Sequence, residues 1–252
     1  MRDTRIHQTR TGMISTPTQR AVSAVLSRGP VIPVLVIDDA SQAAALARAL
    51  VAGGLDVLEV TLRTPAALEA VRRIREAVPE AVVGVGTVLE AGQLEEAHRT
   101  GAAFAVSPGA TARLLDAACG HPMPLLPGAA TVSEAMALRE RGYHHLKFFP
   151  AEAAGGARFL ASLAPVIGDL RFCPTGGVNA TNAPAYLALS NVTCVGGSWM
   201  VPRERVVAED WAGITTLAAA AAALRSAQER SAQPGHATRL RDGGEAFAPG
   251  PT

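Results

Sequence analysis

The residue with the clearest chemical potential is Lys147, which lies in the largely apolar stretch 145–150. The chain has 23 lysine and arginine residues, and Lys147 is the single lysine among them. An arginine stays protonated and is no practical nucleophile, whereas a buried lysine can lose its proton and attack a carbonyl carbon. Lys147 is therefore a candidate for Schiff-base formation. The alternative is a lysine whose side chain reaches along its strand to solvent.

Two charged residues, Glu59 and Arg63, lie in and just after the apolar stretch 57–62. Strand alternation places Glu59, Thr61 and Arg63 on one face and the apolar residues on the other. Charged groups are seldom buried unless they are paired or functional. If this face points into the protein opposite Lys147, a functional role is favoured over a buried Glu59–Arg63 ion pair that only fixes the structure.

Polar residues and glycines end three further predicted strands. Thr87 can hydrogen-bond a carboxylate, although a lone threonine at such a place is more often a helix cap. The segments Thr175-Gly176-Gly177 and Gly196-Gly197-Ser198 end the last two strands. Glycine lets backbone N–H groups approach an anion closely. One glycine pair would indicate only a tight turn, whereas two pairs and a serine hydroxyl favour a phosphate site.

These residues depend on a repeating pattern of strands and helices. Apolar, strand-like stretches recur roughly 20–25 residues apart, which leaves room for one helix and two short loops. The predicted strands are 31–37, 57–62, 82–88, 104–107, 124–127, 145–149, 171–175 and 193–198. The predicted helices are 16–27, 41–52, 66–77, 90–100, 111–119, 131–141, 156–163, 179–189 and 210–225. Thr16-Pro17 opens the first helix, Thr131 and Glu134 form a capping box, and Asn179 is a candidate cap.

This alternation predicts an α/β fold, a (β/α)8 TIM barrel with an N-terminal capping helix. The alternative is an open doubly wound sheet, which more often carries a G-x-G-x-x-G turn after its first strand. Here Ile37-Asp38-Asp39 ends that strand, and no such turn follows. In a barrel the active site lies at the carboxyl ends of the strands, and the loops after strands seven and eight often bind phosphate.

Composition narrows the function classes. Hydrophobic residues make up 48% of the chain and aromatic residues 4%, which predicts an aliphatic core. A formal net charge of +1 gives no electrostatic case for nucleic acid or a membrane surface. Three scattered cysteines suit a reducing cytoplasm rather than disulfides or a zinc site. We expect a leader over 1–15, one domain over 16–225 and a disordered tail over 226–252.

The histidines do not form a metal site in this interpretation. His144 should point outward, and His145 should share the inward face of Lys147 but lie deeper in the protein. Both are interpreted as structural residues. His98 and His121 fall in a predicted helix and a predicted loop. Because no His, Asp and Glu cluster has metal-ligand spacing, a divalent-metal aldolase or hydrolase is disfavoured.

Six motifs together resemble one family, the 2-keto-3-deoxy-6-phosphogluconate (KDPG) aldolases of the Entner–Doudoroff pathway. They are Leu58-Glu59-Val60-Thr61-Leu62-Arg63-Thr64, Val85-Gly86-Thr87-Val88, Val106-Ser107-Pro108-Gly109, Leu146-Lys147-Phe148-Phe149-Pro150-Ala151-Glu152, Arg171-Phe172-Cys173-Pro174-Thr175-Gly176-Gly177 and Val195-Gly196-Gly197-Ser198-Trp199. They occur in the order and spacing of that family. The resemblance runs from about Thr18 to about Leu224.

The resemblance implies a role for each matching residue. Lys147 would form the imine, Glu59 would be the general acid and base, and Arg63 and Thr87 would hold the pyruvate carboxylate. The remaining positions would line the pocket (Pro108, Phe149, Thr175) or bind phosphate (Gly176, Gly177, Gly197, Ser198). The family implies a class I lyase without metal or cofactor, cytoplasmic and usually homotrimeric, that acts in carbohydrate metabolism.

The implied reaction is cleavage of 2-dehydro-3-deoxy-6-phosphogluconate to pyruvate and glyceraldehyde 3-phosphate. Related aldolases act on 4-hydroxy-2-oxoglutarate or on the galactonate epimer, so either remains an alternative main activity. The hydroxyl of Thr175 favours the gluconate epimer, and the glycine pairs favour a phosphorylated substrate. A phospho-sugar sensor of another class would need the phosphate loops but would not need Lys147 and Glu59.

Overall fold

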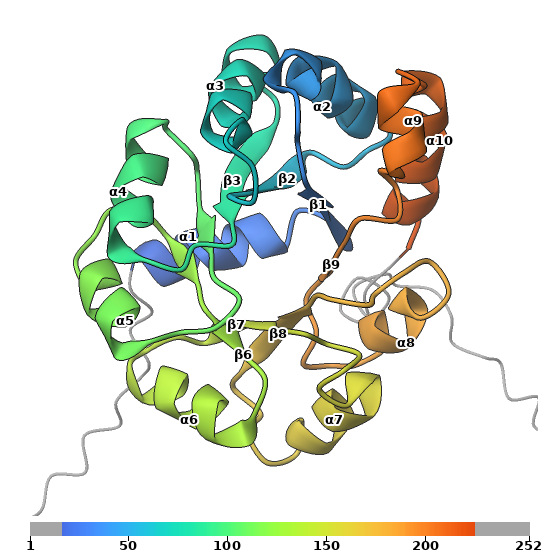
Figure 1. Cartoon of the computed structure of the whole chain (residues 1–252). Coiled ribbons are helices and arrows are strands. Elements are labelled where there is room, and N and C mark those ends of the chain that lie inside the picture. Colours follow the sequence, from blue (N-terminus) through green and yellow to red (C-terminus); the bar gives the residue numbers. More distant parts are fainter. Residues whose placement is uncertain (1–16, 225–252) are drawn as a thin grey trace, which may run out of the picture.

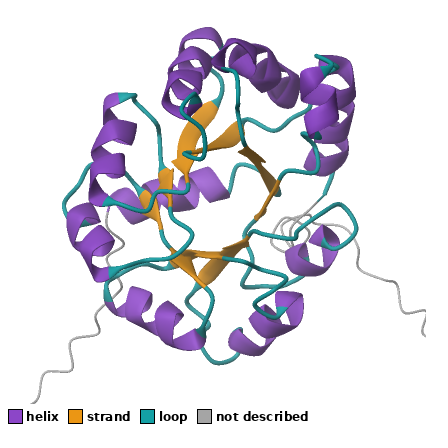
Figure 2. Ribbon diagram, in the orientation of Figure 1, coloured by secondary structure: helices purple, strands orange, loops and turns teal. Residues whose placement is uncertain are grey.

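The computed structural model describes residues 17–224, in which parallel strands alternate with helices (Figures 1 and 2). The strands are β1 (Val31–Leu35), β2 (Val57–Thr61), β3 (Val82–Gly86), β4 (Ala105–Val106), β5 (Leu125–Leu126), β6 (Gly128–Ala129), β7 (His145–Phe148), β8 (Arg171–Pro174) and β9 (Val195–Gly197). The α-helices are α1 (Pro17–Leu26), α2 (Ala43–Ala52), α3 (Ala67–Ala77), α4 (Ala91–Arg99), α5 (Ala112–Ala118), α6 (Val132–Glu140), α7 (Gly156–Leu163), α8 (Ala183–Leu187), α9 (Arg203–Val207) and α10 (Trp211–Ala222), and the 3-10 helix η1 (Ala40–Gln42) precedes α2. None of these helices is long and apolar enough to cross a bilayer.

The strands form one curled arrangement with most helices on its outer side, and α1 runs across the middle of the ring (Figures 1 and 2). One sheet has the order β5-β4-β3-β2-β1-β9 and the other the order β6-β7-β8. Only Pro127 separates β5 from β6 in the chain. On the other side, the pair Phe172–Val192 connects β8 to the segment before β9, and the pair Thr175–Gly196 connects the residue after β8 to β9 itself. All of these pairings are parallel, so the strands end on the same side of the molecule.

Alternate residues of each strand face different parts of the core. On β2, Leu58 and Val60 belong to a cluster that also contains helix residues such as Ile74 of α3. Val22 and Leu26 of α1 belong to a second cluster, together with residues near the starts of strands such as Val57 of β2. The apolar face of β2 therefore packs against helices, as alternation predicted, and leaves the other face to the interior.

The predicted strands are all present, with ends that differ by at most two residues. The predicted stretch 124–127 contains β5, and β6 begins at the residue that follows it. The predicted capping box of Thr131 and Glu134 is confirmed at the start of α6. Thr16 and the predicted leader and tail over 1–15 and 226–252 lie outside the described residues.

One helix start was wrong, and one helix was not predicted. The side chain of Asn179 accepts hydrogen bonds from the N–H groups of Thr181 and Asn182, which closes a local turn instead of a helix. Asn182 then stands at the N-cap position of α8, which begins at Ala183. The short helix α9 follows Pro202, and the sequence analysis had left this segment unassigned.

Candidate active site

The centre of the site is a contact between β7 and β2. The ammonium Nζ of Lys147 donates a hydrogen bond to Oε1 of Glu59 over 3.1 Å. Their side chains are 6% and 5% exposed, so the pair is almost fully removed from solvent. A buried ion pair of this kind is weak evidence for stability, because desolvation of two charges offsets much of their attraction. β2 therefore faces Lys147. The alternative, a lysine side chain that reaches along its strand to solvent, is wrong.

A glycine on the neighbouring strand makes room for this carboxylate. β2 and β3 pair in parallel, with Glu59 opposite Gly84 and Thr61 opposite Gly86. A Cβ atom at Gly86 would lie 2.0 Å from Oε1 of Glu59. Gly86 is thus a site residue that the sequence reasoning did not single out. The available signal was a glycine inside a strand, which often marks a close approach of another group.

Phe149 borders the lysine on the side of the glycine turn. Nζ of Lys147 lies 5.3 Å from the centroid of the Phe149 ring, within the range of a cation–π contact. A Cβ atom at Gly176 would lie 3.2 Å from two atoms of the same ring. Phe149 therefore borders both the nucleophile and the loop after β8, and its role as an aromatic wall beside the substrate stays a prediction.

Pro108 lies in the loop that follows β4, beside the site. The carbonyl oxygen of Pro108 would be 2.2 Å from a Cβ atom at Gly128. Gly128 is the β6 residue that pairs with Lys147. Because only a glycine permits this approach, the loop after β4 packs directly against the backbone beside the lysine.

Thr87 has an unusual backbone conformation. Its φ angle is 61°, in the left-handed region. This region is rarely occupied by a β-branched residue, and such strained residues concentrate at functional sites. Thr87 comes directly after Gly86, so its conformation sets how the chain leaves β3 beside Glu59.

Arg63 lies at the exit of β2 and is exposed. Its N–H donates to the carbonyl of Thr61, two residues back, so the chain has left the strand ladder at this point. Within residues 17–224, the guanidinium has no hydrogen bond or ion pair. The predicted alternative, a buried Glu59–Arg63 ion pair, is wrong because Glu59 pairs with Lys147 instead. Thr61 donates its hydroxyl to the Leu35 carbonyl and holds β2 against β1.

The two glycine pairs stand at adjacent strand ends. Gly176 and Gly177 have φ angles of 97° and 79°, which strongly favour glycine. Thr175, which is 6% exposed, points its Oγ1 toward Gly196, where a Cβ atom would lie only 2.3 Å away. Among the described residues, the N–H of Gly177 has no hydrogen-bond acceptor. The predicted pocket residue Thr175 thus connects the two loops.

The loop after β9 opens onto a cavity. A Cβ atom at Gly197 would overlap the Trp199 ring at 2.0 Å, so this glycine is required by packing. Ser198 lines a cavity of about 720 Å³ together with Val34 and Val36 of β1 and its exit, and with residues of α9. The lining also includes Asp38 and Asp39, but none of Glu59, Lys147, Gly176 and Gly177.

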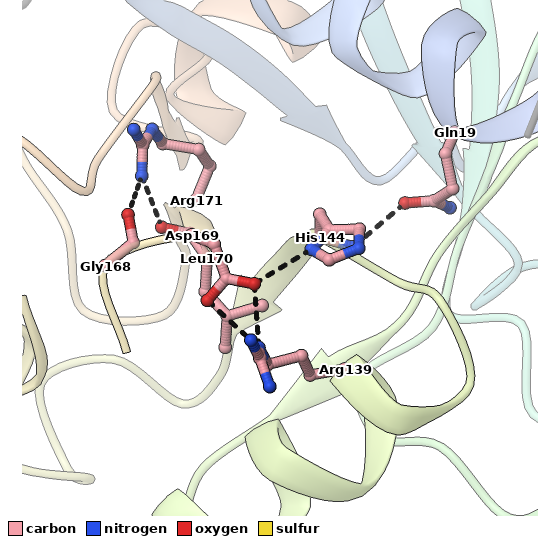
Figure 3. A network of polar contacts seen from close by, with 7 residues as sticks. All are labelled: Gln19, Arg139, His144, Gly168, Asp169, Leu170 and Arg171. Carbon is pink, nitrogen blue, oxygen red and sulfur yellow. Dashed lines mark hydrogen bonds and ion pairs between the residues drawn. The ribbon is translucent and has the colours of Figure 1, made fainter. Parts of the chain in front are cut away.

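His144 lies at the opposite, amino-terminal side of the strands, in a polar network (Figure 3). The His144 N–H donates to Oε1 of Gln19 in α1, and the His144 ring lies 3.5 Å from the Asp169 carboxylate. Arg139 of α6 donates to the same carboxylate over 2.7 Å. The network joins α1, α6 and the entry of β8, which agrees with a structural role for His144.

His145 is held in its neutral form. Burial is the main cause that lowers its pKa to about 4, and the charge of Arg171 adds to the effect. Arg171 itself donates to the carbonyls of Gly168 and Leu170 (Figure 3). His145 precedes Lys147 by two residues in β7, so the two share one face of the strand, with His145 nearer its start.

Comparison with known proteins places this geometry in a family. The family model for KDPG and KHG aldolase matches residues 22–217. A 2-dehydro-3-deoxy-phosphogluconate aldolase of Pseudoalteromonas atlantica is 51% identical over 199 residues, which cover 79% of this chain and 93% of that protein.

Two solved structures are similar over nearly their whole length. The KDPG aldolase of Legionella pneumophila, with pyruvate captured as a covalent carbinolamine intermediate, is 47% identical with a TM-score of 0.78 and covers 82% of this chain and 98% of its own. The aldolase of Zymomonas mobilis with 3-phosphoglycerate is 50% identical with a TM-score of 0.79, at coverages of 83% and 98%. Sequence and structure agree over the segment that carries Glu59 and Lys147, and the chain therefore belongs to the KDPG and KHG aldolase family.

Proposed function

We propose that this chain is a class I aldolase that cleaves 2-dehydro-3-deoxy-6-phosphogluconate to pyruvate and glyceraldehyde 3-phosphate. The observation that carries the proposal is the buried contact between Lys147 and Glu59. A nucleophilic amine and a proton-transfer group within hydrogen-bond distance are what imine chemistry requires. The carbinolamine captured in the Legionella relative also requires an amine nucleophile, and Lys147 is the single lysine of this chain.

The first half of the reaction forms the imine. Lys147 transfers a proton to Glu59 and attacks the C2 ketone of the substrate as a neutral amine. Glu59, directly or through water, then protonates the carbinolamine hydroxyl, which leaves as water. The product is an iminium ion at C2. The adjoining Phe149 ring, 5.3 Å from Nζ, favours this cation through its negative face.

The second half breaks the carbon–carbon bond. The Glu59 carboxylate, or water under its control, takes the proton of the C4 hydroxyl, and the C3–C4 electron pair moves toward the iminium nitrogen. Glyceraldehyde 3-phosphate leaves, and an enamine remains on Lys147. Protonation at C3 and attack of water at C2 then release pyruvate and restore the free lysine. No step needs an external electron donor or acceptor.

The ends of the substrate are assigned from charge and backbone geometry. Arg63, exposed at the exit of β2, and Thr87, beside Glu59, bind the C1 carboxylate. Gly176, Gly177, Gly197 and Ser198 bind the distal phosphate, with Thr175 between the two ends. The orientation is supported by the N–H of Gly177, which has no acceptor among the described residues, and by the Ser198 hydroxyl that follows the second glycine pair.

The finer structural assignments belong to the same proposal. The strands close into an eight-stranded barrel in which β5 and β6 form one strand, and α1 covers its amino-terminal end through Val22 and Leu26. The barrel works in the cytoplasm as a homotrimer within carbohydrate metabolism. The 4-hydroxy-2-oxoglutarate activity named in the family description is a side activity here, because that substrate has no phosphate for the glycine loops.

Direct assay of the cleavage reaction tests the proposal. Purified protein is given 2-dehydro-3-deoxy-6-phosphogluconate, and pyruvate is measured by its reduction with lactate dehydrogenase and NADH. We expect pyruvate release that is lost in Lys147→Arg, which keeps the positive charge but removes the nucleophile. The absence of pyruvate with the wild-type chain, or full activity of the variant, would overturn the proposal.

A further inference from the structure

A tyrosine and a glutamate outside the catalytic pair meet behind the loop that follows β8. The Tyr186 hydroxyl of α8 donates a hydrogen bond to Oε1 of Glu152, which follows the β7 exit. Tyr186 is only 1% exposed, although it carries a polar group. Burial and the carboxylate together raise the pKa of the Tyr186 hydroxyl, so it stays a donor. Neither residue has a role in the proton transfers described above.

Glu152 is in direct contact with the glycine turn. Its N–H donates to the Gly176 carbonyl over 3.1 Å. A Cβ atom at Gly177 would lie 2.7 Å from Cγ and 2.8 Å from Cβ of Glu152. The methylene groups of Glu152, rather than its carboxylate oxygens, therefore pack against Gly177. Ala151 adds a second backbone bond, from its N–H to the Thr175 carbonyl over 2.8 Å.

The carboxylate itself is turned toward the start of α7. A Cβ atom at Gly156 would lie 3.5 Å from Oε1 of Glu152 and 3.6 Å from the Tyr186 hydroxyl oxygen. Tyr186 thus fixes which way the glutamate points. This matters electrostatically, because an unrestrained carboxylate beside the glycine turn would repel an anion bound there.

The other side of the turn is also held. Nδ2 of Asn182 donates to the Gly177 carbonyl over 3.0 Å. Asn182 and Tyr186 both belong to the α8 region, at the N-cap and inside the helix. The segment after β7 and the start of α8 therefore enclose Gly177 between them.

We propose that Tyr186 is a positioning residue that acts through Glu152 to hold the Gly176–Gly177 turn ready for the phosphate of the substrate. This inference rests on the proposed function, which assigns the turn to phosphate binding. It deepens that assignment, since it names the groups that give the turn its shape and keep a negative charge away from it. The hydroxyl of Tyr186 matters through the direction in which it holds Glu152.

The test compares substrates with and without a phosphate. Tyr186→Phe removes the hydroxyl and keeps the ring. We expect its KM for 2-dehydro-3-deoxy-6-phosphogluconate to rise roughly 5–10-fold, which corresponds to about 1–1.4 kcal/mol, the typical net contribution of one hydrogen bond. Its kcat, its reductive trapping with pyruvate and its kcat/KM for 4-hydroxy-2-oxoglutarate should each stay within about twofold of wild type, because none of them uses the turn.

Three companion variants sharpen the result. Glu152→Gln keeps an acceptor oxygen for Tyr186 and removes the charge, so its KM should remain at or below the wild-type value. Glu152→Ala removes the methylene groups that pack against Gly177 together with the charge, so its KM should rise through the loss of that packing. It tests the proposal at an exposed side chain if Tyr186→Phe folds poorly. Tyr143→Phe, at the only other tyrosine, is the matched control and should change nothing.

The outcomes separate this inference from the function on which it rests. Equal losses of Tyr186→Phe on both substrates, or no change on either, would overturn the positioning role. Ser198→Ala tests the phosphate site independently. If Ser198→Ala selectively weakens the phosphorylated substrate and Tyr186→Phe does not, only the inference fails. If neither loop prefers a phosphorylated substrate, the assignment of the phosphate site fails with it.

Discussion

The carboxylate of Glu59 lies over Gly86, so close that a single methyl group at residue 86 would stand 2.0 Å from Oε1. Gly86→Ala should therefore displace the carboxylate from Lys147. We expect kcat to fall by at least roughly 10²-fold, the lower end of what a misplaced acid–base group costs, with overpacking that lowers the free energy of unfolding by about 1–3 kcal/mol. Steady-state kinetics and thermal unfolding measure the two effects.

Gly92 provides the control for this substitution. It lies in α4, and a Cβ atom there would have no neighbour within 4 Å. Gly92→Ala should leave kcat unchanged, so any shared loss would point to a general effect of replacing glycine. Wild-type turnover of a folded Gly86→Ala protein would contradict the dependence of catalysis on this close approach.

Glu59→Gln keeps the shape of the side chain and removes its capacity to move protons. We expect kcat to fall by roughly 10²–10⁴-fold, the usual contribution of general acid–base catalysis. The variant should still be able to form the imine with pyruvate slowly, because Lys147 is retained. Turnover is measured by pyruvate release, and a near wild-type rate would show that Glu59 has another role.

Arg63→Gln tests the carboxylate end of the substrate. Because both 2-dehydro-3-deoxy-6-phosphogluconate and 4-hydroxy-2-oxoglutarate carry the C1 carboxylate, KM should rise for both, by roughly 10–100-fold for a lost charge-assisted contact. Ser198→Ala, at the other end, should affect only the phosphorylated substrate. An Arg63 variant that weakens the phosphorylated substrate alone would reverse the proposed orientation.

Stability toward acid should depend on His145. Its pKa is about 4 in the folded protein and close to 6.5 when unfolded, so the unfolded chain binds the extra proton first. The free energy of unfolding therefore has its full value with respect to His145 above about pH 6.5, and it falls as the pH drops from 6.5 toward 4. His145→Gln cannot titrate and should show a shallower fall of Tm over this range. Identical slopes for the two proteins would contradict the assignment.

Most of the fold could be predicted from the sequence, because the strands and the helices are each marked by their own residue patterns. The alternation in β2 placed Glu59 inward, and the parallel order of strands brought it to the same end as Lys147. The start of α8 could not be predicted from Asn179 alone. Its side chain serves equally well as a helix cap or as the acceptor of a local turn, and only the packing of the loop decides.

Other parts of the site depend on distances that the sequence does not encode directly. The contact between Gly86 and Glu59 follows from the register of β2 and β3, which no local pattern specifies. The exposure of Arg63 follows from the end of β2 at Thr61, two residues earlier than strict alternation implies. The proposed homotrimer is tested in solution by size-exclusion chromatography with light scattering, which measures the mass of the assembly.

Reductive trapping is the most direct test of imine formation by Lys147. The protein is incubated with pyruvate and sodium borohydride, and intact and peptide masses are then measured. Lys147 and the N-terminal amine are the only primary amines of the chain that can form an imine. We expect a reduced pyruvyl adduct on the peptide that contains Lys147, and none in Lys147→Arg. A folded wild-type protein without this adduct would contradict the Schiff-base mechanism and favour a phospho-sugar-binding protein that lacks catalysis.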